Sequence, residues 1–121
     1  KYYVVDMAFK QLLLPDINRD RGHVLENVVY LELRRRGYTV YVGQLTKGEI
    51  DFVAQKPGGI LEYYQVSESV LDPTTRDREL APLEAVKDQY PKFLLTMDEL
   101  YKPHNYNGIQ QCNVVDWLLG M

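Results

Sequence analysis

The chain has 121 residues, of which 45% are hydrophobic and 26% charged, and its formal net charge is −3. These values suit one globular domain over residues 1–121, and the acidic balance argues against wholesale nonspecific binding of nucleic acid. The one cysteine, Cys112, excludes an internal disulfide and a cysteine-rich zinc site, which suits a cytoplasmic protein, and no apolar run approaches the roughly 20 residues that a membrane-spanning helix needs.

The first third of the chain predicts a strand and two helices. Residues 1–5 form a β-prone run, and a short helix is expected over residues 7–14. The strongest helix is expected over residues 24–36, with the cations Arg34–Arg36 complementing the dipole of its last turn. The chain opens inside a strand-like run without an initiator methionine, so we expect it to be the C-terminal fragment of a larger protein.

Three strands are expected next in close succession, over residues 38–42, 49–55 and 60–67. Each run is rich in branched and aromatic residues, and Lys56-Pro57-Gly58-Gly59 is a good hairpin connector between the second and the third. The three strands should therefore form an antiparallel meander.

The last third predicts a helix and two further strands. Residues 72–90 have helical spacing, with Pro82 expected to break the helix or start a turn. Strands are expected over 92–96 and 109–115, separated by loop-like residues, and Asp116 is expected to cap a final turn. A helix that returns the chain to the same sheet implies a crossover. The fold class is therefore α/β, with a mixed sheet of about four or five strands flanked by helices.

Three polar residues interrupt apolar elements: Glu26 in the long helix, Asp51 in the second strand of the meander and Gln65 in the third. Adjacent antiparallel strands could bring Asp51 and Gln65 together beneath Glu26. Converging oxygen ligands can hold Mg²⁺, and a bound metal can activate water for phosphodiester cleavage. In the structural alternative, Glu26 and Asp51 pair with protein groups, while Gln65 and Ser67 satisfy each other and the strand.

Several segments carry a resemblance to a known family. The runs GHVLENVVYLEL (22–33), GYTVYV (37–42) and GEIDFV (48–53) resemble the PD-(D/E)XK nuclease superfamily, which has the restriction-endonuclease-like fold. Together with KYYVVD (1–6) and VVDWLL (114–119), they make the whole chain similar to a domain of unknown function. That domain follows the ATPase domain in many prokaryotic AAA-type ATPases.

The resemblance implies a set of catalytic site residues, two of which are replaced in this chain. Glu26 matches the helix glutamate of the superfamily and Asp51 matches the strand aspartate, so these two would be the metal ligands. Where the superfamily has Glu-X-Lys, this chain has Gln65-Val66-Ser67. The amide of Gln65 brings no charge to a metal, and Ser67 brings none to a phosphate. These candidate catalytic positions are therefore expected to be vestigial.

The leading hypothesis is a non-catalytic, nuclease-like accessory domain of an AAA-type ATPase. Its expected partners are its own upstream ATPase domain and either DNA or another protein, with no membrane contact. One alternative is an active Mg²⁺-dependent DNA endonuclease in which Lys47 or Lys10 has taken over the role of the missing lysine. Another is a structural element for oligomerisation of the ATPase. Arg34, Arg35 and Arg36 are candidates for contacting phosphates, or else form a solvated helix end.

Overall fold

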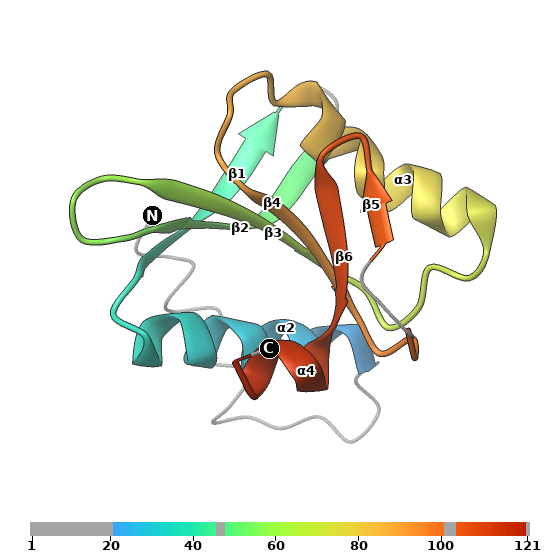
Figure 1. Cartoon of the computed structure of the whole chain (residues 1–121), viewed down its shortest axis with the longest axis horizontal. Coiled ribbons are helices and arrows are strands. Elements are labelled where there is room, and N and C mark those ends of the chain that lie inside the picture. The colour runs from blue at the N-terminus through green and yellow to red at the C-terminus, as the bar shows by residue number, and fades with distance from the viewer. Residues whose placement is uncertain (1–20, 46–47, 101–103, 121) are drawn as a thin grey trace.

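The computed structural model describes residues 21–45, 48–100 and 104–120 (Figure 1). The predicted strand over residues 1–5 and helix over residues 7–14 lie outside these ranges. The helices of the described residues are α2 (Arg21–Arg35), α3 (Pro73–Ala85) and α4 (Val114–Leu118). The strands are β1 (Thr39–Leu45), β2 (Gly48–Gln55), β3 (Leu61–Val66), β4 (Lys92–Thr96), β5 (His104–Tyr106) and β6 (Ile109–Asn113).

The strands form one mixed sheet in the order β1-β2-β3-β4-β6-β5. Strands β1, β2 and β3 make the expected antiparallel meander, and β4 and β6 then continue the sheet parallel to β3. The parallel step from β3 to β4 requires a crossover, which α3 supplies. This arrangement confirms the α/β fold class and agrees with the restriction-endonuclease-like fold.

The sheet has six strands within the described residues, one more than the four or five expected. The additional strand is β5, a three-residue strand in the region expected to be a loop. It pairs antiparallel with β6 through a two-residue turn, Asn107-Gly108, in which both residues have positive φ (55° and 94°). That conformation is typical of tight hairpins and suits Asn-Gly.

Helices cover both faces of the sheet, with α2 and α4 on one side and α3 on the other (Figure 1). Strand β3 runs through the centre, so nearly all of its residues are buried. Its alternating side chains feed two cores: Tyr64 packs with Trp117 on the α2 side, and Tyr63 packs with Leu83 on the α3 side. No helix of the described residues is long and apolar enough to cross a membrane.

Two details of the last helices differ from the sequence-based expectation. Pro82 neither breaks nor starts a turn; it is buried inside α3, which continues to Ala85. The cap of the final helix is Asn113, whose side-chain oxygen accepts hydrogen bonds from the backbone N–H groups of Val115 (2.8 Å) and Asp116 (3.2 Å). The expected cap, Asp116, lies in the first turn because β6 ends at Asn113, two residues earlier than predicted.

Candidate functional site

Asp51 lies in a β-bulge of β2. Tyr41 of β1 pairs with Val53 and Gly43 pairs with Ile50, so one residue of β1 faces two residues of β2, one of which is Asp51. A bulge of this kind interrupts the alternation of side chains along a strand and redirects them. Accordingly, Val53 and Ile50 both pack on the α3 side although they are three positions apart.

The bulge depends on the glycine opposite it. A Cβ atom on Gly43 would lie 2.9 Å from Val53 Cγ2 and 3.1 Å from Ile50 Cβ. The first distance is shorter than a normal contact, and the second involves an atom fixed to the backbone. Gly43 therefore permits the close approach of the two strands beside Asp51.

Side chains replace the backbone ladder between β2 and β3 at Asp51. The Gln65 side-chain oxygen accepts a hydrogen bond from the Asp51 N–H (2.7 Å), and Asp51 Oδ2 accepts one from the Val66 N–H (2.9 Å). The Gln65 amide nitrogen donates to the carbonyl of Glu79 in α3 (3.1 Å). Gln65 therefore joins β2, β3 and α3 through backbone contacts.

The electrostatic surroundings of Asp51 favour the protonated carboxyl. Burial and the neighbouring carboxylate of Glu26 raise its pKa from 3.8 to about 8, against the lowering effect of the hydrogen bond from Val66. Glu79 and Glu49 raise it further. Among the described residues, the charged groups with the largest effect on the pKa of Asp51 are thus carboxylates, and Glu26 is the foremost of them.

Ser67, at the position of the superfamily lysine, directly follows β3 and is also engaged. Its hydroxyl donates to the carbonyl of Ser69 (3.1 Å), and its N–H donates to the carbonyl of Leu95 (3.0 Å). Gln65 and Ser67 were expected to satisfy each other in the structural alternative. They instead donate to different backbone carbonyls: Gln65 to that of Glu79 and Ser67 to that of Ser69.

The sequence-predicted site residues are therefore brought together in part. Asp51 touches Gln65 and acts electrostatically with Glu26. However, the Asp51 Oδ2 and Gln65 side-chain oxygens already accept backbone hydrogen bonds. Within residues 21–45, 48–100 and 104–120, no three His, Cys, Asp or Glu side chains group closely enough to hold a metal. The described residues alone therefore do not supply the several converging oxygen ligands that Mg²⁺ takes. Lys47 and Lys10 lie outside the described residues.

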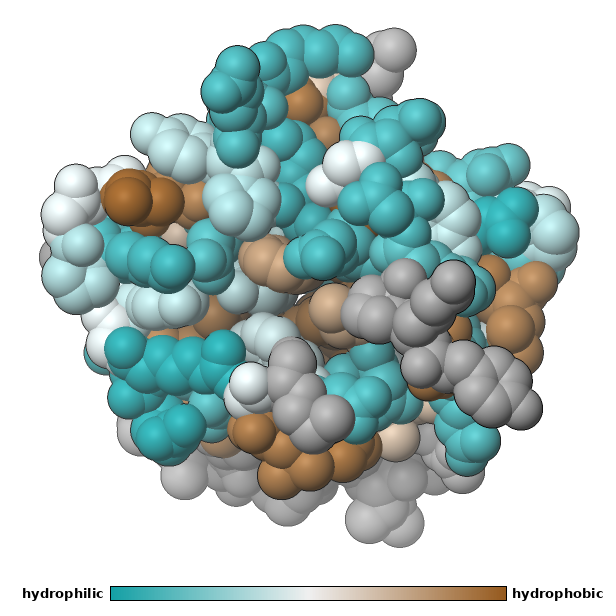
Figure 2. All heavy atoms as spheres, viewed as in Figure 1, coloured by the Kyte–Doolittle hydropathy of each residue, from teal (hydrophilic) through white to brown (hydrophobic). Residues whose placement is uncertain are grey.

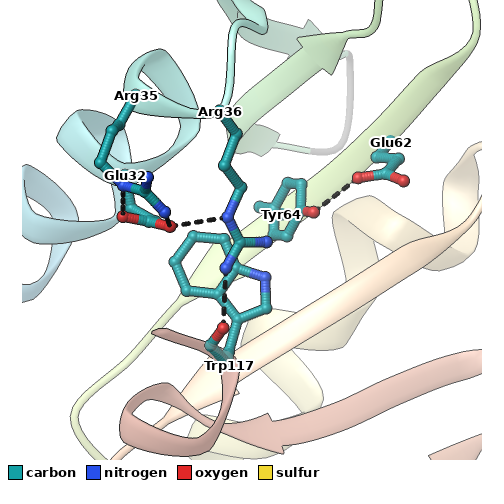
Figure 3. Close-up of polar contacts among 6 residues, drawn as sticks. All are labelled: Glu32, Arg35, Arg36, Glu62, Tyr64 and Trp117. Carbon is teal, nitrogen blue, oxygen red and sulfur yellow. Dashed lines mark hydrogen bonds and ion pairs between the residues drawn. The ribbon is translucent and has the colours of Figure 1, made fainter. Parts of the chain in front are cut away.

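The three arginines at the end of α2 have different surroundings (Figure 3). Arg35 binds both carboxylate oxygens of Glu32 (2.8 and 2.7 Å), and Arg36 binds the same carboxylate at 2.7 Å. These hydrogen bonds lower the pKa of Glu32 to about 2. Arg36 also donates to the Trp117 carbonyl (2.8 Å) and lies 4.3 Å from the centre of its ring, so it fastens α4 to α2. Arg34 is exposed.

Glu62, a buried carboxylate on β3, has a cation beside it. Its side chain forms an ion pair with Lys56 (2.9 Å) and accepts a hydrogen bond from the Tyr64 hydroxyl (2.6 Å; Figure 3). Burial and this hydrogen bond raise the pKa of Tyr64 above its usual value. Glu62 is thus compensated by a cation and a hydroxyl, whereas Asp51 faces other carboxylates.

One buried polar group was missed by sequence reasoning. Asp98 follows β4, in the region expected to be a loop, and its carboxylate accepts hydrogen bonds from the Ser69 hydroxyl (2.7 Å) and the Val70 N–H (2.9 Å). The Gln111 amide lies 3.5 Å from the same carboxylate, and Asn113 donates to the Asp98 carbonyl (3.0 Å). The available signal was the clustering of polar residues where β3, β4 and β6 end, since parallel strands end at the same edge. The satisfied hydrogen bonds make this group structural.

Two longer proteins are similar to this chain, and neither has a named activity. It is 40% identical over 119 residues, 98% of its length, to an uncharacterized protein of Haemophilus influenzae, and covers 28% of that protein. It is 34% identical over 93 residues, 73% of its length, to the uncharacterized protein MJ1544 of Methanocaldococcus jannaschii, and covers 20% of it. No family model and no solved structure matches the chain. The chain therefore spans less than a third of each of these relatives.

Proposed function

We propose that this domain is a non-catalytic binding module with a nuclease-like fold, and that it serves an AAA-type ATPase domain in a longer cytoplasmic protein. The observation that carries the proposal is the role of Gln65, which bonds the backbones of Asp51 and Glu79. A superfamily nuclease would present a metal-binding carboxylate at that position. Ser67 bonds the Ser69 carbonyl and brings no positive charge to a phosphate.

The surroundings of the basic helix end favour a protein as the partner. Arg35 and Arg36 share the carboxylate of Glu32, which cancels one of their two positive charges, and Arg36 also donates to the Trp117 carbonyl. Only Arg34 of the three is left exposed without a described ion pair, while the chain as a whole is acidic. A phosphate backbone is bound by several uncompensated cations, so nucleic acid is the less favoured partner.

The first test is a cleavage assay. The domain is expected to leave single-stranded, duplex and branched DNA intact in Mg²⁺ or Mn²⁺. Loss of one preorganised stabilising group costs on the order of a hundred- to a thousand-fold in rate, and here a carboxylate and a lysine are both missing. Metal-dependent cleavage that disappears in Asp51→Ala would contradict the proposal.

The second test restores the motif with the double substitution Gln65→Glu and Ser67→Lys. If the site keeps the shape of an active relative, calorimetry should detect Mg²⁺ binding in the double variant and none in the wild type. Glu79→Gln is the matched control, because it removes a neighbouring carboxylate without restoring the motif. Binding by the wild type would contradict the non-catalytic assignment.

The carboxylates around Asp51 favour a second candidate, the active Mg²⁺-dependent endonuclease. A cation would relieve the repulsion between Asp51 and Glu26. This function needs a replacement lysine, for which Lys47 and Lys10 are the candidates. Cleavage that is lost in Lys47→Ala or Lys10→Ala would establish it.

Retention on DNA at different salt concentrations separates a nucleic-acid partner from a protein partner. Binding through phosphates weakens steeply as salt rises, and it should weaken further in Arg34→Ala. We expect little retention of the wild type at physiological salt. Strong, salt-dependent retention would make nucleic acid the partner.

A further inference from the structure

A cavity of about 540 Å³ lies at the amino-terminal ends of β4 and β6. Asp51, in contrast, lies beside the carboxyl end of β3, so the cavity is separate from the nuclease-like site. Its walls are the last turn of α3, the loop over residues 86–91 and the turn between β5 and β6. In Figure 2, hydrophilic residues at the upper end of the molecule form a rim around hydrophobic ones.

One wall of the cavity is held by a network centred on Asp88. The carboxylate of Asp88 accepts hydrogen bonds from the Tyr63 hydroxyl (2.5 Å), the Tyr90 N–H (3.0 Å) and Lys92 Nζ (3.2 Å). Lys92 Nζ also donates to the carbonyls of Asp88 (3.0 Å) and Tyr90 (3.1 Å). The loop is therefore fixed before any ligand arrives, which lowers the entropic cost of binding.

The lining combines an apolar region with polar groups of both kinds. Val86 packs against the core that contains Leu83 and Ile109, and Tyr90, which is 39% exposed, also lines the cavity. The rim carries exposed side chains of opposite charge and two amide side chains: Glu84, Lys87, Gln89 and Asn107. The volume falls in the range of natural ligand sites.

We propose that this cavity binds a short peptide segment of a protein partner through one apolar anchor side chain. Val86 and Tyr90 are the lining residues that would contact this anchor. The amides of Gln89 and Asn107 can each donate to and accept from a peptide backbone, which presents N–H and C=O groups in alternation. The proposal rests on the proposed function, in which the domain binds a protein.

The charges of the lining argue against a nucleic-acid ligand in this cavity. The lining carries Glu84 as well as Lys87, and Lys92 already donates to Asp88 and Tyr90. A phosphate would therefore meet as much negative as positive charge. A peptide with an apolar side chain meets no such penalty.

Selection from a phage-displayed library of peptides of about 12 residues tests the proposal. The target is the whole 121-residue chain, and enriched sequences are synthesised and their affinities measured by calorimetry. Tyr90→Ala removes the exposed ring. Asn107→Gly removes an amide while keeping the positive φ of 55°, which glycine accepts without strain. Leu71→Ala is the matched control, because Leu71 is a 79% exposed apolar residue outside the cavity lining.

Enriched peptides should share an apolar residue and bind the wild type and Leu71→Ala equally. They should bind Tyr90→Ala about tenfold more weakly, and Asn107→Gly about threefold more weakly, as for a lost hydrogen bond. Circular dichroism confirms that each variant is folded. Failure to enrich any peptide, or peptides that bind both cavity variants as well as the wild type, would overturn the proposal. Metal-dependent DNA cleavage would instead contradict the proposed function and leave the cavity assignment standing.

Discussion

Asp51 and Asp88 occupy opposite ends of the same sheet and have opposite electrostatic surroundings. Asp51 accepts a hydrogen bond from the Val66 N–H and lies among carboxylates, and its pKa is raised to about 8. Burial acts to raise the pKa of Asp88 as well, but the hydrogen bonds from Tyr63, Tyr90 and Lys92 outweigh it and hold the pKa below the usual value. Donors and a cation, rather than burial alone, thus decide which carboxyl is ionised.

The difference separates two uses of a carboxylate in this fold. At Asp88 the ionised group organises a loop through three donors and so contributes to a preformed cavity wall. At Asp51 the neighbouring Glu26 repels the ionised form. At the end of the sheet that resembles a nuclease site, the ionised carboxylate of Asp51 is therefore disfavoured. At the other end, the ionised carboxylate of Asp88 is stabilised by hydrogen-bond donors and a cation.

The largest expected effect comes from Asp51→Asn at high pH. Folding raises the pKa of Asp51 from 3.8 to about 8, so the folded state holds this proton more tightly than the unfolded chain. The resulting stability is fully present below about pH 4 and is lost as the pH rises through 8. At about 1.4 kcal/mol per pKa unit, the loss in free energy of unfolding between these pH values is at most roughly 6 kcal/mol. Local relaxation and entry of water should reduce it to about 2–4 kcal/mol.

Urea denaturation at pH 5 and pH 9, followed by circular dichroism, measures this effect. Asn keeps the oxygen that accepts from Val66 but does not ionise, so Asp51→Asn should be more stable than the wild type at pH 9. Glu99→Gln is the control, since Glu99 is exposed. The comparison fails if Asp51→Asn and the wild type lose the same stability between the two pH values.

Gly43→Ala tests whether the bulge sets the position of Asp51. The new methyl group would lie 2.9 Å from Val53 Cγ2, so we expect a loss of about 2 kcal/mol through overpacking. Adding Val53→Ala removes that contact and should recover part of the loss, giving a favourable coupling in a double-mutant cycle. Strictly additive effects in the cycle would show that the contact between the two strands is not the cause.

Lys92→Met tests whether the cation beside Asp88 stabilises its ionised carboxylate and the loop around it. It removes three hydrogen bonds from Nζ, to Asp88 and to the carbonyls of Asp88 and Tyr90. We expect a loss of about 1–2 kcal/mol and a rise in the pKa of Asp88, measured by urea denaturation and by carboxyl chemical shifts in NMR. Lys87→Met, at an exposed lysine of the same loop, should change neither quantity. Equal effects of the two substitutions would refute the role given to Lys92.

The smallest effect is expected at the end of α2. Arg36→Ala removes the hydrogen bond to the Trp117 carbonyl and the contact with its ring, and should cost about 1 kcal/mol. Arg35→Ala removes a pair whose arginine side chain is 72% exposed and screened by water, and should cost less than Arg36→Ala. Thermal melts of the two variants measure the difference. The reverse order would mean that Arg36 does not fasten α4.

The sequence predicted the elements whose signals are local. The helix ending before Gly37, the hairpin at Pro57-Gly58-Gly59 and the strand after Pro91 all appear near their expected positions. The crossover and the mixed sheet followed from the order of these elements. Strand β5 was missed because its three residues carry too little periodicity to stand out from a loop.

The candidate site was harder to predict because it depends on register. Sequence reasoning brought Asp51 and Gln65 to adjacent strands, and they are in contact. It did not predict that Gln65 bonds the backbone of Asp51, since the bulge opposite Gly43 exists only once β1 and β2 are paired. The Asp98 group likewise forms only when the ends of β4 and β6 are aligned.

The position of Trp117 makes the α2–α4 junction observable by optical spectroscopy. It is the single tryptophan of the chain, 6% exposed, lying beneath the Arg36 guanidinium and 5.7 Å from the ring centre of Tyr64. Excitation near the red edge of its absorption therefore reports from one place in the core. A partner that detaches α4 would shift the emission to longer wavelengths as water reaches the indole. A peptide bound in the distant cavity would leave it unchanged.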